Sequence, residues 1–107
     1  MICITTSSDS KEVLVKISKF LIENKLSACN KITTTHSSFM WEDKYNLSKE
    51  YKLEIKTTES LEDSVIDCID RNHNYKIYEL SKYKFEIINP KYQEWFYDRL
   101  NNIEKEK

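Results

Sequence analysis

The spacing of apolar residues along this chain alternates between the period of a strand and the period of a helix. An apolar, β-branched run at residues 1–7 predicts a strand buried on both faces. A helix should follow, because Asp9 with Glu12 fits a capping box, although Ser10 is a competing cap. Asn24 and Lys25 are expected to end this helix, since Asn tolerates the left-handed conformation at a helix C-terminus. The apolar stripe of the helix comprises Val13, Leu14, Ile17, Phe20 and Leu21.

A period of two predicts a second and a third strand joined by a hairpin. The second strand should begin at Ala28, and the chain is expected to turn around residues 42–48 before it returns. On the returning strand, one face carries Tyr51, Leu53 and Ile55, and the other carries Lys52, Glu54 and Lys56. Such alternation is typical of a sheet with one solvated face.

The C-terminal half predicts a helix, a fourth strand and a last helix. The second helix should begin near Ser60, and the alternation in residues 82–88 predicts a strand. Asn89 as a cap and Pro90 at the first helical position are typical of a helix start. The apolar positions are Leu61, Val65, Cys68 and Ile69 on the second helix, Tyr83, Phe85 and Ile87 on the strand, and Tyr92, Trp95, Phe96, Leu100 and Ile103 on the last helix. A solvated tail is expected from about residue 104.

The predicted order of elements is a doubled β-α-β unit followed by an extra helix. This order indicates one α+β domain over residues 1–107 with a ferredoxin-like, four-stranded antiparallel sheet that carries two helices on one face. The other face would present Trp41 and other aromatic residues, with only the last helix to cover it. Because an uncovered apolar face is typical of an association surface, we expect an oligomer.

The composition excludes several classes of function. With 17 basic and 18 acidic residues and a net charge of −1, the chain lacks the basic footprint of a nucleic-acid-binding protein. No apolar run approaches the roughly 20 residues that span a bilayer, and the N-terminus lacks the features of a signal peptide. We therefore expect a cytoplasmic protein without membrane contact. Since the chain contains no glycine, neither a glycine-rich phosphate loop nor a nucleophile elbow of the usual form is available, and we expect no enzymatic activity.

The three cysteines predict buried, reduced thiols. Cys3, Cys29 and Cys68 are an odd number without C-x-x-C spacing, which argues against a disulfide framework. Each lies in a periodic apolar context, so we interpret them as core residues, with soft-metal ligation as the alternative. His36 lies in a polar strand rich in Thr and Ser and is interpreted as a surface residue.

Five short segments, taken in order, resemble a known family. They are NKLSACNKI, SSFMWEDK, YKLEIKTT, NHNYKIYEL and NPKYQEWF, which lie between residues 24 and 96, and the resemblance as a whole covers essentially residues 2–97. Together they resemble the CutA divalent-cation tolerance family. The chain departs from the family pattern in the hairpin, where Asp43 stands in place of a glycine, and after the second helix, where Asn74 and Tyr78 replace two prolines.

The resemblance implies a homotrimer of ferredoxin-like subunits whose sheets pack together, with a role in tolerance to copper and other divalent metals. It leaves two other functions open. One is a small-ligand sensor like the PII signalling proteins, and the other is a scaffold that assembles or anchors other proteins. Both would use the clefts between subunits.

The resemblance also implies roles for particular residues. The expected interface or cleft positions are Trp41, Tyr75, Glu79, Tyr92 and Trp95. His73 matches a motif histidine, and three copies of His73, with Glu79, would converge in a trimer to hold a divalent cation such as copper. The alternative is that His73 only ends a helix, where the helix dipole favours it. Thr6 and Asn72 occupy positions where relatives carry further ligands, so any copper or zinc binding is expected to be weak.

Overall fold

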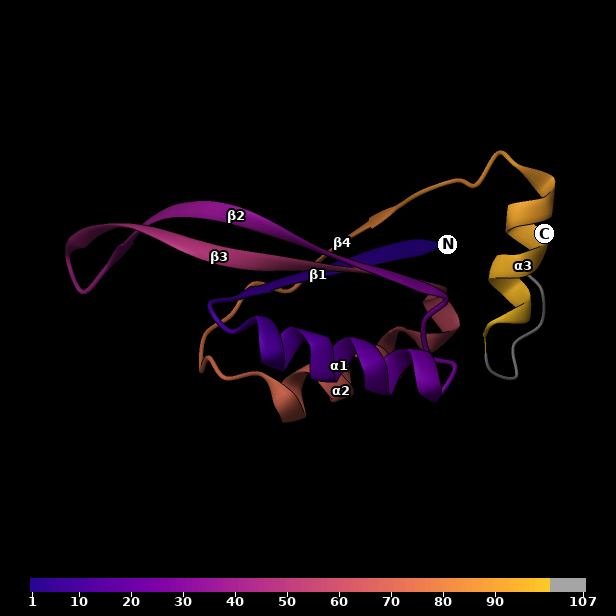
Figure 1. Cartoon of the computed structure of the whole chain (residues 1–107), viewed down its shortest axis with the longest axis horizontal. Helices are drawn as coiled ribbons and strands as arrows, with labels where there is room; N and C mark the ends of the chain where they lie inside the picture. The colour runs from indigo at the N-terminus through magenta and orange to yellow at the C-terminus, as the bar shows by residue number, and fades with distance from the viewer. Residues whose placement is uncertain (101–107) are drawn as a thin grey trace.

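The computed structural model describes residues 1–100, in which two helices pack against one face of a four-stranded antiparallel sheet (Figure 1). The elements are β1 (Ile2–Ser8), α1 (Lys11–Glu23), β2 (Cys29–Trp41), β3 (Lys44–Thr57), a 3₁₀ turn (Glu59–Leu61), α2 (Glu62–Asn72), β4 (Ser81–Lys84) and α3 (Pro90–Asp98). The strands lie in the order β2-β3-β1-β4. This arrangement confirms the predicted α+β, ferredoxin-like architecture with an extra C-terminal helix.

The main core lies between the sheet and the two helices. Apolar residues at helical spacing on α1 and α2 meet apolar residues at a spacing of two on β1 and β3. The buried members of this core are Ile2, Ile4, Leu14, Ile17, Leu21, Leu53, Ile55, Val65, Cys68 and Ile69. Each fully buried aliphatic side chain contributes about 1.5–3 kcal/mol relative to an exposed one. The predicted stripes therefore hold the two layers together, with the exception of Phe20, which remains 49% exposed.

The ends of α1 differ slightly from the prediction. Ser10, and not Asp9, is the N-cap, because its Oγ accepts a hydrogen bond of 3.3 Å from the backbone N–H of Val13. At the C-terminus, the left-handed residue is Lys25, with φ of 57°, and not Asn24. The N–H of Leu26 donates to the carbonyl oxygen of Leu21 at 2.8 Å, which is the 6→1 hydrogen bond of a Schellman motif. A lysine here supplies a conformation that glycine usually provides.

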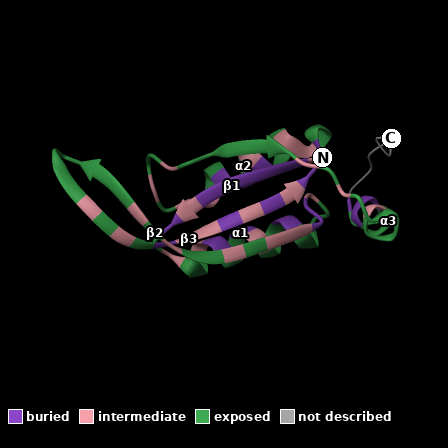
Figure 2. Ribbon diagram, turned by 90° about the horizontal axis from the view of Figure 1, so that it is seen from above, coloured by how far each residue is buried: buried purple, intermediate pink, exposed green. Residues whose placement is uncertain are grey.

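The hairpin between β2 and β3 is tighter than predicted. Its turn consists only of Glu42 and Asp43, whose φ angles are 50° and 62°, and Trp41 pairs directly with Lys44. Left-handed conformations at both central residues are those of a type I′ turn. The expected turn over residues 42–48 is therefore wrong, because most of that segment belongs to β3. The extra length projects beyond β1 as a two-stranded arm, residues 35–50, that is largely exposed (Figure 2).

The fourth strand is shorter than the predicted 82–88, because only Ser81–Lys84 pairs with β1. Phe85 and Ile87 leave the sheet and pack against α3, where the rings of Phe85 and Phe96 meet edge to face at 6.1 Å. The buried members of this second cluster are Ala28, Phe96, Tyr97 and Leu100. Consequently α3 packs at one end of the sheet and does not cover its open face (Figure 1). Ile103 and the expected tail lie outside the described residues.

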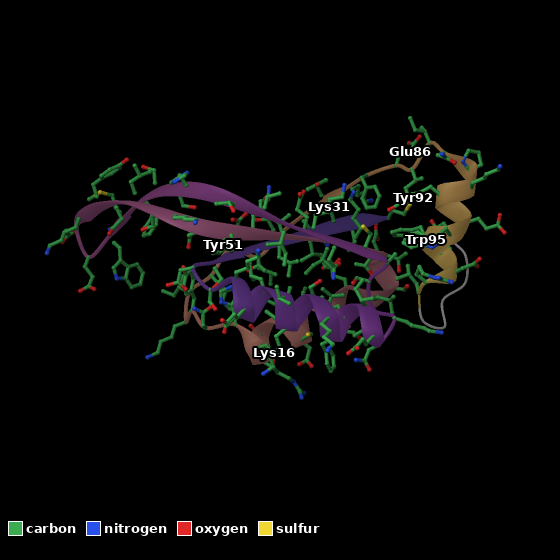
Figure 3. The ribbon with its side chains drawn as sticks, in the orientation of Figure 1. Lys16, Lys31, Tyr51, Glu86, Tyr92 and Trp95 are labelled. Atoms are coloured by element: carbon green, nitrogen blue, oxygen red, sulfur yellow. The ribbon has the colours of Figure 1, made fainter. Side chains whose placement is uncertain are left out.

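The open face of the sheet is polar at its centre and carries aromatic residues at its margins, with Tyr83 on the edge strand β4 and Trp41 on the arm. The strand register places Lys31, Glu54, Thr5 and Ser81 in one row across the sheet, and Thr33, Lys52 and Ser7 in the next. Figure 3 shows Lys31 on this face and Tyr51 on the side of the helices. The alternation predicted for β3 is thus confirmed. No helix within residues 1–100 is long and apolar enough to cross a membrane.

Candidate functional site

The loop after α2, residues 73–80, is held against the end of β1 by a histidine that uses both ring nitrogens. His73 Nε2 lies 2.9 Å from the carbonyl oxygen of Ser7, and His73 Nδ1 accepts a hydrogen bond of 3.0 Å from the backbone N–H of Tyr75. Because Nδ1 accepts, Nε2 must carry the proton and donate to Ser7. The geometry therefore assigns His73 as a neutral imidazole of one defined tautomer.

Packing around the ring supports the neutral form. The His73 ring stacks on Tyr78 with centroids 4.2 Å apart and an interplanar angle of 10°. The hydroxyl of Tyr78 in turn donates to Asp70 on α2. Burial lowers the pKa of His73, while the Ser7 carbonyl and the carboxylates of Asp9 and Glu50 act in the opposite direction.

The hydroxyl of Tyr75 joins this loop to two other parts of the chain. It donates to Glu50 Oε2 at 2.6 Å and accepts from the backbone N–H of Asp9 at 2.8 Å. Glu50 lies on β3 and is only 8% exposed. Burial, followed by the nearby Glu50 carboxylate, raises the pKa of Tyr75, so the hydroxyl remains a hydrogen-bond donor at neutral pH.

Asn74 completes the connection between the loop and the start of α1. Its Oδ1 accepts from the hydroxyl of Ser8 at 2.6 Å, and its Nδ2 donates to Asp9 Oδ1 at 2.9 Å. A proline, which the family pattern has at this position, offers neither group. We call the set of Asp9, Glu50, His73, Asn74, Tyr75 and Tyr78 the loop cluster.

The loop cluster does not form a metal site within one chain. A metal ion at His73 would displace either Tyr75 from Nδ1 or Ser7 from Nε2. Glu79 is exposed, and its Oε2 accepts from the hydroxyl of Ser81 at 3.1 Å. Residues 1–100 contain no group of three or more His, Cys, Asp or Glu side chains that could hold a metal ion. A metal site that uses His73 and Glu79 therefore stays a prediction, and it requires ligands from more than one subunit.

The other expected interface residues lie at opposite ends of the molecule. Trp41 is at the tip of the arm and is 54% exposed. Tyr92 and Trp95 lie on α3 with ring centroids 5.3 Å apart, and both project from the helix toward the sheet (Figure 3). The structure thus brings Tyr75 together with His73, and Tyr92 together with Trp95. It leaves Trp41 separate from both pairs.

The cysteines follow the prediction only in part. Cys3 and Cys68 are buried, whereas Cys29 is partly exposed. Cys3 and Cys29 lie on either side of Lys56 in the same row of the open sheet face. Burial, followed by the neighbouring Asp67, raises the pKa of the Cys68 thiol, which makes it a weak nucleophile at neutral pH.

Sequence reasoning did not place Glu50 or Asp9 in the loop cluster. The Tyr75 hydroxyl reaches Glu50 across 25 residues of sequence and Asp9 across 66. No local spacing connects them, since only the pairing of β3 beside β1 brings these segments together. Glu50 continues the charged positions Lys52, Glu54 and Lys56 at a spacing of two, so the sequence pattern does not distinguish it from an exposed residue.

Element order, sheet order, the long hairpin arm and the packed loop after α2 define a ferredoxin-like α+β protein. The sequence profile of the CutA1 divalent ion tolerance protein family matches residues 1–99. The chain belongs to this family, as the resemblance suggested.

Individual relatives agree with the family assignment. A protein CutA 1, chloroplastic, from Oryza sativa subsp. japonica is 34% identical over 87 residues, which cover 80% of this chain and 49% of the relative. The chain thus spans about half the length of this plant protein. The crystal structure of CutA1 from Oryza sativa has a TM-score of 0.87 at 30% identity and covers 95% of this chain and 94% of that chain. The periplasmic divalent cation tolerance protein CutA from Archaeoglobus fulgidus has a TM-score of 0.86 at 26% identity, over 94% of this chain and all of that one.

Proposed function

We propose that this chain works as a non-enzymatic, homotrimeric divalent-cation tolerance protein in the cytoplasm. The observation that carries the proposal is the family match over residues 1–99. The likeness to the rice CutA1 structure, with a TM-score of 0.87, supports it. The names of relatives give two different compartments, chloroplast and periplasm, so the cytoplasmic location rests on the sequence alone.

Two separate apolar surfaces support association into a ring. On the arm, the exposed side chains are Phe39, Met40, Trp41, Tyr45 and Leu47, and near α3 they are Ile88, Tyr92 and Trp95. These surfaces lie at opposite ends of a molecule with a longest extent of 47 Å (Figure 1). Because the two surfaces differ, a head-to-tail contact between them is heterologous and closes into a ring when the rotation permits. The family resemblance, which implies a homotrimer, indicates that the ring contains three subunits.

The growth of copper-sensitive cells tests this function. Bacteria that lack their own CutA protein would express this chain or its arm variant Leu47→Lys, and growth would be followed across a range of copper concentrations. We expect the unchanged chain to raise the copper concentration that halves growth, and the variant to do so less because it assembles poorly. Unaltered copper sensitivity in cells that contain the assembled, soluble chain would contradict a role in tolerance.

Metal binding by the trimer is proposed to be weak and to depend on His73, with Glu79 as a second ligand. The hydrogen bonds that already occupy both nitrogens of His73 support this, because they would compete with a metal ion. Titration calorimetry with Cu²⁺ and Zn²⁺ should show binding that fades below about pH 6.5 and is lost in His73→Ala. The matched control is His36→Ala on the arm. Tight binding that survives His73→Ala in a chain that remains trimeric would place the site elsewhere.

A further inference from the structure

The side chain of Tyr78 connects the ring of His73 to α2. One face of the His73 ring lies against the Tyr78 ring, with centroids 4.2 Å apart and an interplanar angle of 10°. The hydroxyl of Tyr78 donates to Asp70 on α2, and Tyr78 also packs against the main core. Tyr78 is therefore held at both its ring and its hydroxyl, although it lies in a loop without helix or strand.

The backbone around His73 does not by itself fix the imidazole. The N–H of His73 donates to the carbonyl oxygen of Ile69 at 2.9 Å, which holds the backbone of His73 at the end of α2. The side chain still has several rotamers available. The loop also lacks the two prolines of the family pattern, which would restrict its backbone, because Asn74 and Tyr78 stand in their places. The orientation of the ring therefore depends on side-chain contacts.

A metal ion at His73 would need the ring in another orientation. An imidazole binds a metal through the lone pair of a ring nitrogen, which lies in the plane of the ring. At Nε2 this direction is taken by the carbonyl oxygen of Ser7 at 2.9 Å, and at Nδ1 by the N–H of Tyr75 at 3.0 Å. Turning the ring to offer a nitrogen to an ion separates it from Tyr78. Because the stacked contact is then lost, Tyr78 opposes metal binding.

We propose that Tyr78 is a positioning residue that holds the His73 ring on Ser7 and closes it to metal ions. The position of the ring follows from contacts within a single chain, whereas the effect on a metal ion rests on the proposed function. A proline at residue 78, as in the family pattern, has neither an aromatic ring nor a hydroxyl and cannot restrain His73 in this way. The departure from the pattern at Tyr78 thus changes how available His73 is to a ligand.

Exchange of the His73 Nε2 proton with water measures how firmly the ring is held. In NMR spectra of the full-length protein at neutral pH, this proton should be visible because the Ser7 carbonyl accepts it. Tyr78→Ala removes the stacked ring and should make the exchange about tenfold faster. Tyr78→Phe keeps the ring and loses only the bond to Asp70, so the exchange should become faster by only about twofold, as in Asp70→Ala.

Zinc alone is the probe for the effect on metal ions, because Zn²⁺ is diamagnetic and the His73 ring signals can be followed during a titration. In Tyr78→Ala, these signals should respond at Zn²⁺ concentrations about fivefold lower than in the unchanged protein. The matched controls are Ile77→Ala, which removes a 76% exposed side chain from the same loop, and Asp67→Ala, which removes another carboxylate of α2. Neither control should alter the proton exchange or the response to Zn²⁺.

Circular dichroism and size-exclusion chromatography would show whether the variants fold and assemble alike. The inference is overturned if the Nε2 proton exchanges equally fast in Tyr78→Ala and in the unchanged protein, or if Zn²⁺ binds His73 equally well in both. If Tyr78→Ala does not fold, unchanged exchange in both Tyr78→Phe and Asp70→Ala overturns it. If Zn²⁺ reaches His73 in neither protein, the proposed metal site is wrong, and the exchange rates alone decide whether Tyr78 positions the ring.

Discussion

Replacing Tyr75 by phenylalanine isolates the hydrogen bonds that fix the loop cluster. The change keeps the ring, which lies 5.2 Å from the His73 ring, and deletes only the hydroxyl. That hydroxyl donates to Glu50 at 2.6 Å and accepts from the N–H of Asp9 at 2.8 Å. Tyr75→Phe therefore removes the direct side-chain connection between the loop and β3 while leaving the packing of the loop almost unchanged.

The expected loss of stability follows from how far the two hydrogen-bond partners of the Tyr75 hydroxyl, Glu50 and Asp9, are buried. The Glu50 carboxylate is 8% exposed, so water replaces the lost donor poorly. A hydrogen bond to a charged group is worth about 1.5–3 kcal/mol. The N–H of Asp9 is exposed and can bond to water, so its loss adds little. We expect Tyr75→Phe to lower the free energy of unfolding by about 2 kcal/mol per chain.

Urea unfolding at one fixed protein concentration is the appropriate assay, because the stability of an oligomer depends on concentration. The matched control is Tyr83→Phe, which deletes another tyrosine hydroxyl that donates to a glutamate, Glu54, at 3.2 Å. Tyr83 is 49% exposed, so its change should lower the free energy of unfolding by less than about 0.5 kcal/mol. In a chain that also carries Glu50→Gln, Tyr75→Phe should lower the free energy of unfolding by less, since the buried carboxylate of residue 50 is no longer present. Equal losses of unfolding free energy in Tyr75→Phe and Tyr83→Phe would refute this reasoning. So would a loss from Tyr75→Phe that is as large in the Glu50→Gln chain as in the unchanged chain.

Three further predictions concern pH, thiols and assembly. Burial lowers the pKa of His73 below 6.5, so the stability that its neutral form contributes is complete above pH 6.5 and is lost as the pH falls below that value. Urea titrations at several pH values should show this loss of stability. His73→Gln should abolish this pH dependence, whereas His36→Gln, at an exposed histidine, should not. In the native protein, a thiol reagent followed by mass spectrometry should modify the partly exposed Cys29 first and the fully buried Cys3 last, and simultaneous labelling of both would contradict the packing described. Leu47→Lys, on the exposed arm, should shift the sedimentation profile toward smaller species, and an unchanged profile would remove the arm from the interface.

The architecture could be predicted because the apolar periodicity is regular where the core forms. The stripes of α1 and α2 and the alternation of β1 and β3 meet in one buried cluster. The errors lie where tertiary contacts override local signals. Glu42 and Asp43 adopt a turn usually marked by glycine, so the polar segment after them was mistaken for loop. Phe85 continues the alternation of β4 but lies beyond its last paired residue, Lys84, and its ring packs against Phe96 of α3.

The candidate site was only partly predictable. His73 and Tyr75 could be singled out through the resemblance, since they lie in one short motif. The Glu50 carboxylate that accepts from the Tyr75 hydroxyl lies on β3, and Asp9, whose backbone N–H donates to the same hydroxyl, lies between β1 and α1. Their positions depend on long-range strand pairing. The distribution of apolar surface was also misjudged. Alternation places Trp41 on the open face, but the register fills the centre of that face with Lys, Glu, Thr and Ser and leaves the aromatic residues at its ends.

Native mass spectrometry of the protein purified without added metal tests the central claim most directly, because it reports subunit number and bound ions together. A homotrimeric member of the CutA1 family with a weak metal site should appear as a species of about 39 kDa, three times the 12.9 kDa chain, without stoichiometric metal. After addition of Cu²⁺, the trimer should gain ions that a brief buffer exchange removes. A stable monomer of 12.9 kDa at micromolar concentration, or a trimer that carries tightly held metal from the start, would contradict the account.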